Sequence, residues 1–239
     1  MEDRDPHLIQ IFKMDENYLY LFKDYFLLLI YLIALVFAIV YYRKYLDTCL
    51  RYFPILIAYT FFNESLGHVI RYSDDFALWE SYTFANDVIY NIYDLFYYGF
   101  FFYVFYVLNS DKKQQKMIKI LSIIILCGYI IESFYHNPLL VSLYYATSLA
   151  SFSLGFLSLM HLWYILKKHP EHVYSNLMFW ISLGLIIFHF LFPPLFLTGY
   201  LAPQIWYSYN INFIIRIIII IMYSFFCIGF FRSRRRSFR

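Results

Sequence analysis

The chain has 239 residues, of which 62% are hydrophobic and 15% are charged, and its net charge is +3. A soluble globular domain has about 45–50% apolar and about 25% charged residues. This composition excludes an ordinary soluble domain and indicates a protein that lies in a lipid bilayer, which is itself an apolar phase. We expect the bilayer as its surroundings and no nucleic-acid partner.

Seven apolar stretches follow one another along the chain, each near the roughly 20 residues that a helix needs to cross the hydrocarbon core. Membrane-spanning helices are predicted at residues 25–42, 52–70, 87–108, 117–134, 139–166, 177–192 and 208–231. The stretches are continuously apolar rather than alternating, which excludes a membrane β-barrel. A backbone in lipid must also form its own hydrogen bonds. The sequence therefore predicts an all-α polytopic bundle of seven transmembrane helices.

The predicted ends of the bundle are less apolar. Residues 1–24 are acidic and polar, and we expect them on the outer surface, with an interfacial helix at 1–22 and no cleavable signal peptide. The membrane domain covers residues 25–231, and a basic tail follows at 232–239. Within the domain, Pro193 and Pro194 are expected to end the sixth helix, because proline cannot continue the backbone hydrogen-bond ladder. Residues 195–206 would then form an outer loop.

Lysine and arginine residues set the orientation of this bundle. One side holds most of them: Arg43, Lys44, Arg51, Lys112, Lys113, Lys116, Lys119, Lys167, Lys168, Arg232, Arg234, Arg235, Arg236 and Arg239. The positive-inside rule places this side in the cytoplasm, and hence the N-terminus outside. We predict a multi-pass protein of a bacterial inner membrane, with the arginine tail as an anchor for anionic lipids.

Ionisable residues inside spans are costly, and they mark either a site or a buried pair. At 1.5 Å per residue, Glu64, Asp94 and Arg216 all lie roughly 9–12 Å below the outer interface. The candidate ligand-binding residues at this level are Glu64, His68, Asn91, Asp94, His189, Asn212 and Arg216. The guanidinium group of an arginine suits an anionic group or a carboxylate. Two carboxylates that lie close together could also relay a proton.

Two interpretations of this layer stay open. In the first, Arg216 pairs with Glu64 or Asp94 and locks three helices together. In the second, the same residues line an outward-facing pocket for a ligand or an ion, because two carboxylates, a guanidinium group and nearby imidazoles are more than one structural pair needs.

Two known seven-span families are disfavoured by the last helix. Microbial rhodopsins need a lysine there to bind retinal, whereas this chain has Arg216 at the matching depth. The hydrolases similar to alkaline ceramidases and adiponectin receptors use a histidine pair in that helix, and this chain has none there. Glu64, Ser65, His68 and Asp94 loosely resemble the early part of their motif. Without a histidine in the last helix, a zinc site of that type is not expected.

Four longer segments resemble a group of small, uncharacterised seven-span proteins of Bacteroidota. They are YTFFNE at 59–64, DVIYNIY at 87–93, NPLLVSLYYA at 137–146 and NLMFWISLGLIIFH at 176–189. The resemblance covers most of the chain. It implies the seven-span architecture and no known activity.

The functional hypothesis is a non-enzymatic sensor or receptor-like protein. An unknown small ligand would enter from outside and shift the packing of the helices, and a cytoplasmic signalling partner would read the change at the basic loops. We expect no catalytic residues, no cofactor and no metal site. The alternatives are a small transporter coupled to protons through Glu64 and Asp94, and a lipid hydrolase with Glu64 and His68 as the base.

Overall fold

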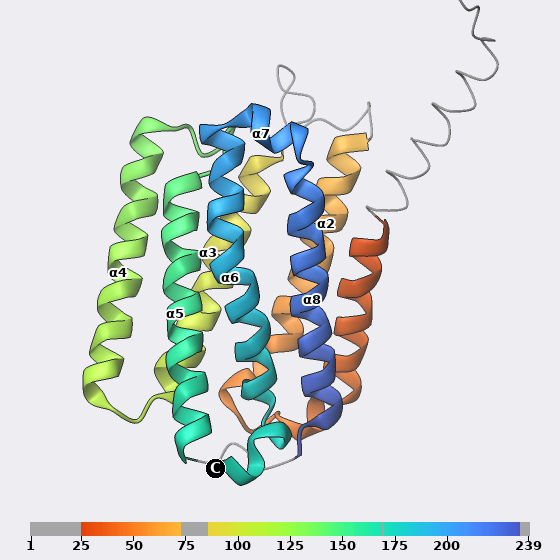
Figure 1. Cartoon of the computed structure of the whole chain (residues 1–239), viewed down its shortest axis with the longest axis vertical. Coiled ribbons are helices and arrows are strands. Elements are labelled where there is room, and N and C mark those ends of the chain that lie inside the picture. Colours follow the sequence, from red (N-terminus) through yellow and green to blue (C-terminus); the bar gives the residue numbers. More distant parts are fainter. Residues whose placement is uncertain (1–24, 73–85, 169, 235–239) are drawn as a thin grey trace, which may run out of the picture.

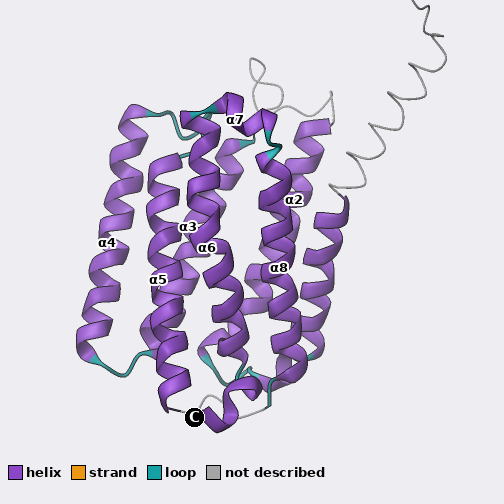
Figure 2. Cartoon of the chain, in the orientation of Figure 1, coloured by secondary structure: helices purple, strands orange, loops and turns teal. Residues whose placement is uncertain are grey.

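The structure is a computed structural model that describes residues 25–72, 86–168 and 170–234, without the side chains of 71, 72 and 170–172. In these residues every regular element is a helix and none is a strand (Figure 2). This confirms the all-α prediction. The interfacial helix expected at 1–22, the connection 73–85 and most of the basic tail lie outside the described residues.

The elements follow one another with short connections. They are the helix Tyr25–Val40, η1 (Tyr42–Lys44), η2 (Cys49–Tyr52), α2 (Phe53–Tyr72), α3 (Asp87–Leu108), α4 (Lys112–Tyr135), α5 (Tyr144–Lys168), η3 (Pro170–Ser175), α6 (Leu177–Leu201), α7 (Pro203–Ser208) and α8 (Ile211–Arg232).

The long helices stand side by side in one upright bundle, and the short α7 lies across the end where α6 ends and α8 begins (Figure 1). Helix α6 lies between α5 and α8 and packs most extensively against these two. Helix α4 stands at the edge of the bundle, where it contacts α3 and α5. The helices that carry the polar layer of the sequence therefore lie within one bundle.

Four of the helices, α4, α5, α6 and α8, are each long and apolar enough to cross a membrane. Large apolar side chains are exposed along the bundle, among them Ile55, Phe62, Ile123, Ile131 and Phe134. An outer surface of this kind is suited to lipid rather than to water. The chain is therefore a multi-pass helical membrane protein.

Helix α6 corrects one prediction. It runs through Pro193 and Pro194 to Leu201 instead of ending before them, so residues 195–206 form no loop but the end of α6 and most of α7. Pro193 has no N–H to donate to the carbonyl of His189, four residues earlier. That carbonyl accepts the hydroxyl of Ser151 on α5 at 3.4 Å instead. A neighbouring helix thus replaces the missing donor, as often occurs in membrane bundles.

Helices α4 and α5 begin at residues other than those predicted. The third predicted span, 87–108, coincides with α3. Helix α4 begins at Lys112 rather than at 117, because the Asp111 side chain accepts the amide of Lys113 at 2.9 Å and caps the helix there. Helix α5 begins at Tyr144 rather than at 139.

Candidate functional site

A cavity of about 490 Å³ extends into the bundle from the end at which α7 lies. It is lined by Leu27, Tyr31, Thr60, Glu64, Asn86, Asp87, Tyr90, Asn91, Tyr93, Asp94, Tyr97, Tyr98, Ser142, Tyr144, Thr147, Phe188, Phe192, Phe196, Gly199, Trp206, Tyr207, Asn212, Ile215, Arg216, Ile219, Met222 and Tyr223. Along α3, its lining runs from Asp87 to Tyr98, a rise of about 16 Å at 1.5 Å per residue. The cavity therefore reaches about the middle of the bundle.

Five residues of the predicted polar layer line this cavity: Glu64, Asn91, Asp94, Asn212 and Arg216. They come from α2, α3 and α8, so three helices bring them to one space. Similar depth and a shared inward face are the two features that predicted their convergence.

The cavity's carboxylates are held by neutral hydroxyl groups. Tyr90 donates to Glu64 Oε2 at 3.1 Å, and Thr147 donates to Asp94 Oδ2 at 2.8 Å. Ser142 donates to Asp87 at the mouth. Each of these bonds helps to fix the position of an acidic group in the cavity wall.

Asn91 has a second role besides lining the cavity. Its Nδ2 donates to the carbonyls of Pro138 and Val141 at 2.7 and 2.9 Å, and its Oδ1 accepts the amide of Leu143 at 3.1 Å. Both amide protons are used by these bonds. Asn91 therefore holds the connection between α4 and α5.

The two predicted histidines do not line the cavity. The His68 ring packs against Tyr25, with ring centroids 5.1 Å apart. His189 is fully buried behind the cavity wall, where its Nε2 lies 3.1 Å from the hydroxyl of Tyr97 and its Nδ1 lies 2.7 Å from the hydroxyl of Ser151. A neutral imidazole protonated on Nδ1 satisfies both contacts, so His189 supports the ring of Tyr97 from behind.

Sequence reasoning missed most of the aromatic lining of the cavity. Tyr90 lies four residues before Asp94 and Tyr97 lies three residues after it, so both share its face. The same periodicity that selected Asp94 and Asn91 would have found them. Phe188, Phe192 and Phe196 form a ladder on α6, in which successive rings stack with centroids 4.9 and 4.8 Å apart.

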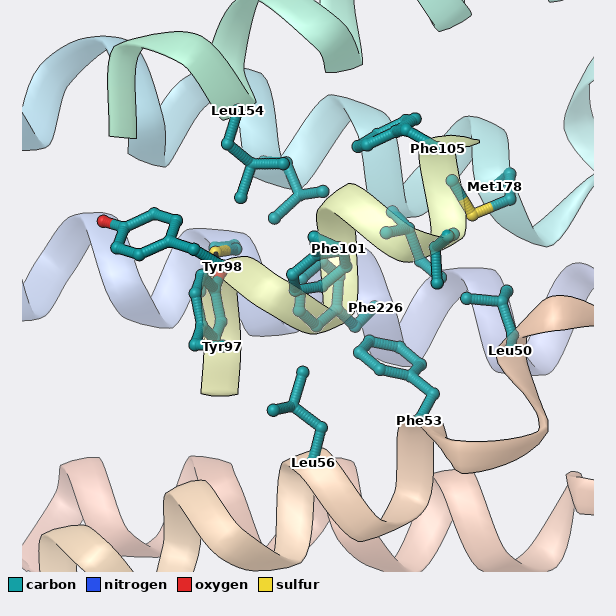
Figure 3. Packing of buried hydrophobic residues seen from close by; sticks show 14 of the residues in the cluster. Leu50, Phe53, Leu56, Tyr97, Tyr98, Phe101, Phe105, Leu154, Met178 and Phe226 are labelled. Carbon is teal, nitrogen blue, oxygen red and sulfur yellow. Dashed lines mark hydrogen bonds between the residues drawn. The ribbon is translucent and has the colours of Figure 1, made fainter. Parts of the chain in front are cut away.

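Next to the deep end of the cavity lining lies a cluster of buried aromatic side chains, the aromatic floor, three of which are labelled in Figure 3. We give this name to Phe53, Phe101, Phe226 and Phe230, all of which are almost fully buried. The ring of Phe53 lies 5.8, 5.4 and 5.7 Å from those of the other three. Phe101 follows Tyr97 by one helical turn, so the floor begins where the cavity lining ends.

The chemistry that the cavity offers is charge recognition within an aromatic wall. Within residues 25–72, 86–168 and 170–234, no group of three or more His, Cys, Asp or Glu side chains is arranged to hold a metal ion. Comparison with known proteins finds no family, no curated protein and no solved structure that matches the chain.

Proposed function

We propose that the protein is a seven-helix, receptor-like membrane protein that binds a small polar ligand in this cavity. The observation that carries the proposal is the cavity itself, in which Glu64, Asp94 and Arg216 line one space from three helices. A volume of about 490 Å³ lies within the range of roughly 300–1,000 Å³ that is usual for small-molecule sites.

In this proposal the helix Tyr25–Val40, α2 and α3 cross the membrane together with the four more apolar helices. Helices α2 and α3 stand beside those four (Figure 1). They are less apolar because they supply the polar wall of the cavity, including Thr60, Glu64 and Asp94. Polar residues on an inward face are compatible with a spanning helix, since they do not meet lipid.

The proposed orientation places the cavity mouth outside the cell. At the opposite end, basic groups lie over tyrosine rings at 4.2–5.1 Å: Lys44 over Tyr41, Arg51 over Tyr52, Lys119 over Tyr106 and Lys168 over Tyr164. Paired basic and aromatic residues are typical of a membrane interface, and an excess of basic residues is typical of the cytoplasmic side.

The receptor-like function requires that binding change the packing of helices. A ligand that contacts Glu64 on α2 and Asp94 on α3 and packs against the cavity-lining face of α8 would draw these three helices together. We propose that a cytoplasmic partner reads this change at the basic end, where Lys112, Lys113 and Lys116 are exposed.

Binding is tested with purified protein in nanodiscs and a library of polar small molecules, scored by the rise in thermal unfolding temperature. We expect compounds that stabilise the wild type and the control Lys113→Ala equally, and whose effect is altered in Arg216→Ala and reduced in Glu64→Ala. The variants must insert and elute like the wild type. If every stabilising compound acts equally on all four proteins, the cavity is not the binding site.

Orientation is tested with single cysteines in a background without the three native ones. Asn137→Cys lies at the mouth end and Asp111→Cys at the basic end, and both positions are exposed. In spheroplasts, a membrane-impermeant maleimide should label Asn137→Cys at once and Asp111→Cys only after permeabilisation. The reverse pattern would overturn the orientation.

The second candidate function is a small proton-coupled transporter, which the two carboxylates Glu64 and Asp94 in one cavity favour. Such a transporter must open the aromatic floor in each cycle, whereas a receptor keeps it closed. A pH-driven substrate flux in proteoliposomes that disappears in Asp94→Asn would decide for transport.

A further inference from the structure

We infer that the cavity's ligand is a small organic cation, a protonated amine or a quaternary ammonium group on an apolar body, and that Asp94 holds its charge. This inference rests on the proposed ligand-binding function and names the chemical class of its ligand.

The lining of the cavity carries an excess of negative charge. Its described lining contains three carboxylates, Glu64, Asp87 and Asp94, against one guanidinium group, that of Arg216. No lysine or histidine is among these lining residues. A cleft with walls of low dielectric strengthens the field of such an excess of negative charge, so the cavity attracts cations more strongly than anions.

Asp94 lines the cavity without an ion pair among the described residues. Among the described residues its one hydrogen-bond donor is the hydroxyl of Thr147, and no Lys, Arg or His nitrogen forms an ion pair with it. Thr147 is itself bonded to the hydroxyl of Tyr129 at 3.0 Å. A carboxylate inside a membrane bundle is costly without a compensating positive charge. A ligand cation would supply that charge from the cavity.

Aromatic side chains lie on the same face of α3 as this carboxylate and line the same cavity. Tyr90, Tyr97 and Tyr98 lie three or four residues from Asp94 on α3 and therefore share its face. The hydroxyl of Tyr97 is bonded to His189, which does not line the cavity, and that of Tyr90 is bonded to Glu64, so both hydroxyls are already engaged within the protein. The negative face of an aromatic ring attracts a cation, most strongly where water is excluded.

The cavity also has an apolar wall, which suits an apolar part of the ligand. The ladder of Phe188, Phe192 and Phe196 lines the cavity along α6 and presents stacked apolar rings. An apolar group that packs against this ladder while its charge meets Asp94 would use both kinds of surface. The ligand would thus carry one cationic end and one apolar end.

The test compares probes that differ in charge but hardly in shape. Benzyltrimethylammonium is the cationic probe, and neopentylbenzene, in which carbon replaces the charged nitrogen, is its neutral counterpart. Benzylphosphonate is the anionic probe. Binding to the full chain in nanodiscs is followed through the fluorescence of Trp206, which lines the cavity, with empty nanodiscs and Trp206→Phe as blanks.

We expect benzyltrimethylammonium to bind at least roughly tenfold more tightly than neopentylbenzene, in keeping with a desolvated cation–π contact and an ion pair. Asp94→Asn, which keeps the shape of the side chain, should reduce this preference to about equal affinity. Asp94→Glu, which keeps the charge, should retain part of it. The control Asp47→Asn, a carboxylate at the basic end, should retain all of it.

Four results would overturn the inference. Equal binding of the cationic and neutral probes would show an apolar cavity without cation recognition. An unchanged preference in Asp94→Asn would show that Asp94 does not hold the cation. Binding of benzylphosphonate alone, lost in Arg216→Ala, would show an anion site. In these three cases the proposed binding function would stand. If no probe binds, the cation is not the ligand class, and the library screen decides the proposed function separately.

Discussion

The carboxylate of Glu132 on α4 accepts the backbone amide of Ala146 on α5, with 2.6 Å between Oε2 and the amide nitrogen. Its Oε1 accepts the neighbouring amide of Tyr145 at 3.1 Å. The first amides of a helix have no partner within the helix, and a negative charge there interacts favourably with the helix dipole. Glu132 therefore caps α5 from a different helix and fastens α4, the helix at the edge of the bundle.

Replacing Glu132 by alanine should destabilise the bundle. The change leaves two amides near the N-terminus of α5 without an acceptor and removes hydrogen bonds to a charged group, which are worth about 1.5–3 kcal/mol. Glu132→Gln should cost less, because its amide oxygen still accepts one bond. Unfolding in SDS mixed micelles measures the loss, with Lys116→Ala on the exposed side of α4 as the control. Equal stability of Glu132→Ala and the control would show that the cap contributes nothing.

Asn91 should behave as a structural residue rather than a ligand contact. Asn91→Asp removes both donors to the carbonyls of Pro138 and Val141, so we expect a loss of about 2–4 kcal/mol in the free energy of unfolding. Hydrogen exchange at the amide of Leu143, which donates to Asn91, should become faster in Asn91→Ala. Asn212→Ala, a matched change elsewhere in the cavity lining, should alter neither quantity. A stable Asn91→Ala that has lost ligand binding would reverse this assignment.

The sequence was sufficient to predict where the polar residues converge. Glu64, Asp94 and Arg216 fall at a similar depth on separate helices, and the cost of exposing a charge to lipid turns all three inward. The long apolar runs likewise predict helices, and α3 is predicted to the residue because Asp87 and Leu108 border its apolar run.

The remaining features depend on contacts between distant segments, which no local pattern contains. Pro193 stays within α6 because Ser151, on another helix, bonds the carbonyl of His189 that the proline leaves without a helical donor. Asn91 is a polar residue on an inward helix face, as a ligand contact would be. Its role in holding the connection between α4 and α5 follows from the position of that connection. The seven-span count, the orientation and the resemblance to Bacteroidota proteins stay predictions.

Close packing between α6 and α8 should make Gly229 intolerant of a side chain. A Cβ atom there would lie 2.8 Å from Trp180 Cβ and 3.0 Å from Leu177 Cδ1, and the first contact is too close to the backbone of α6 to move easily. We expect Gly229→Ala to cost about 1–3 kcal/mol, the usual range for overpacking. Gly99→Ala on α3 is the control, since its Cβ would meet nothing within 4 Å. It should be neutral or stabilising by up to about 1 kcal/mol through helix propensity. Equal effects of the two changes in SDS unfolding would contradict the close approach.

Cys49 should react slowly with maleimides unless the pH is raised. Burial raises the pKa of its thiol from 9.0 to about 11, although a backbone hydrogen bond acts in the opposite direction. The thiolate is the reactive form, and a pKa higher by two units leaves roughly a hundredth of the thiolate at pH 8. In a Cys127→Ser, Cys227→Ser background, N-ethylmaleimide should therefore alkylate the folded protein roughly a hundredfold more slowly than the same protein unfolded in SDS.

The pH profile separates this electrostatic cause from steric protection of Cys49. If the raised pKa is the cause, the rate for the folded protein should rise about tenfold per pH unit up to about pH 10, whereas the rate for the unfolded protein should level off near pH 9. Mass spectrometry of the alkylated peptide measures both rates. A folded rate that is slow but levels off at the same pH as the unfolded rate would show that access, and not the pKa, limits the reaction.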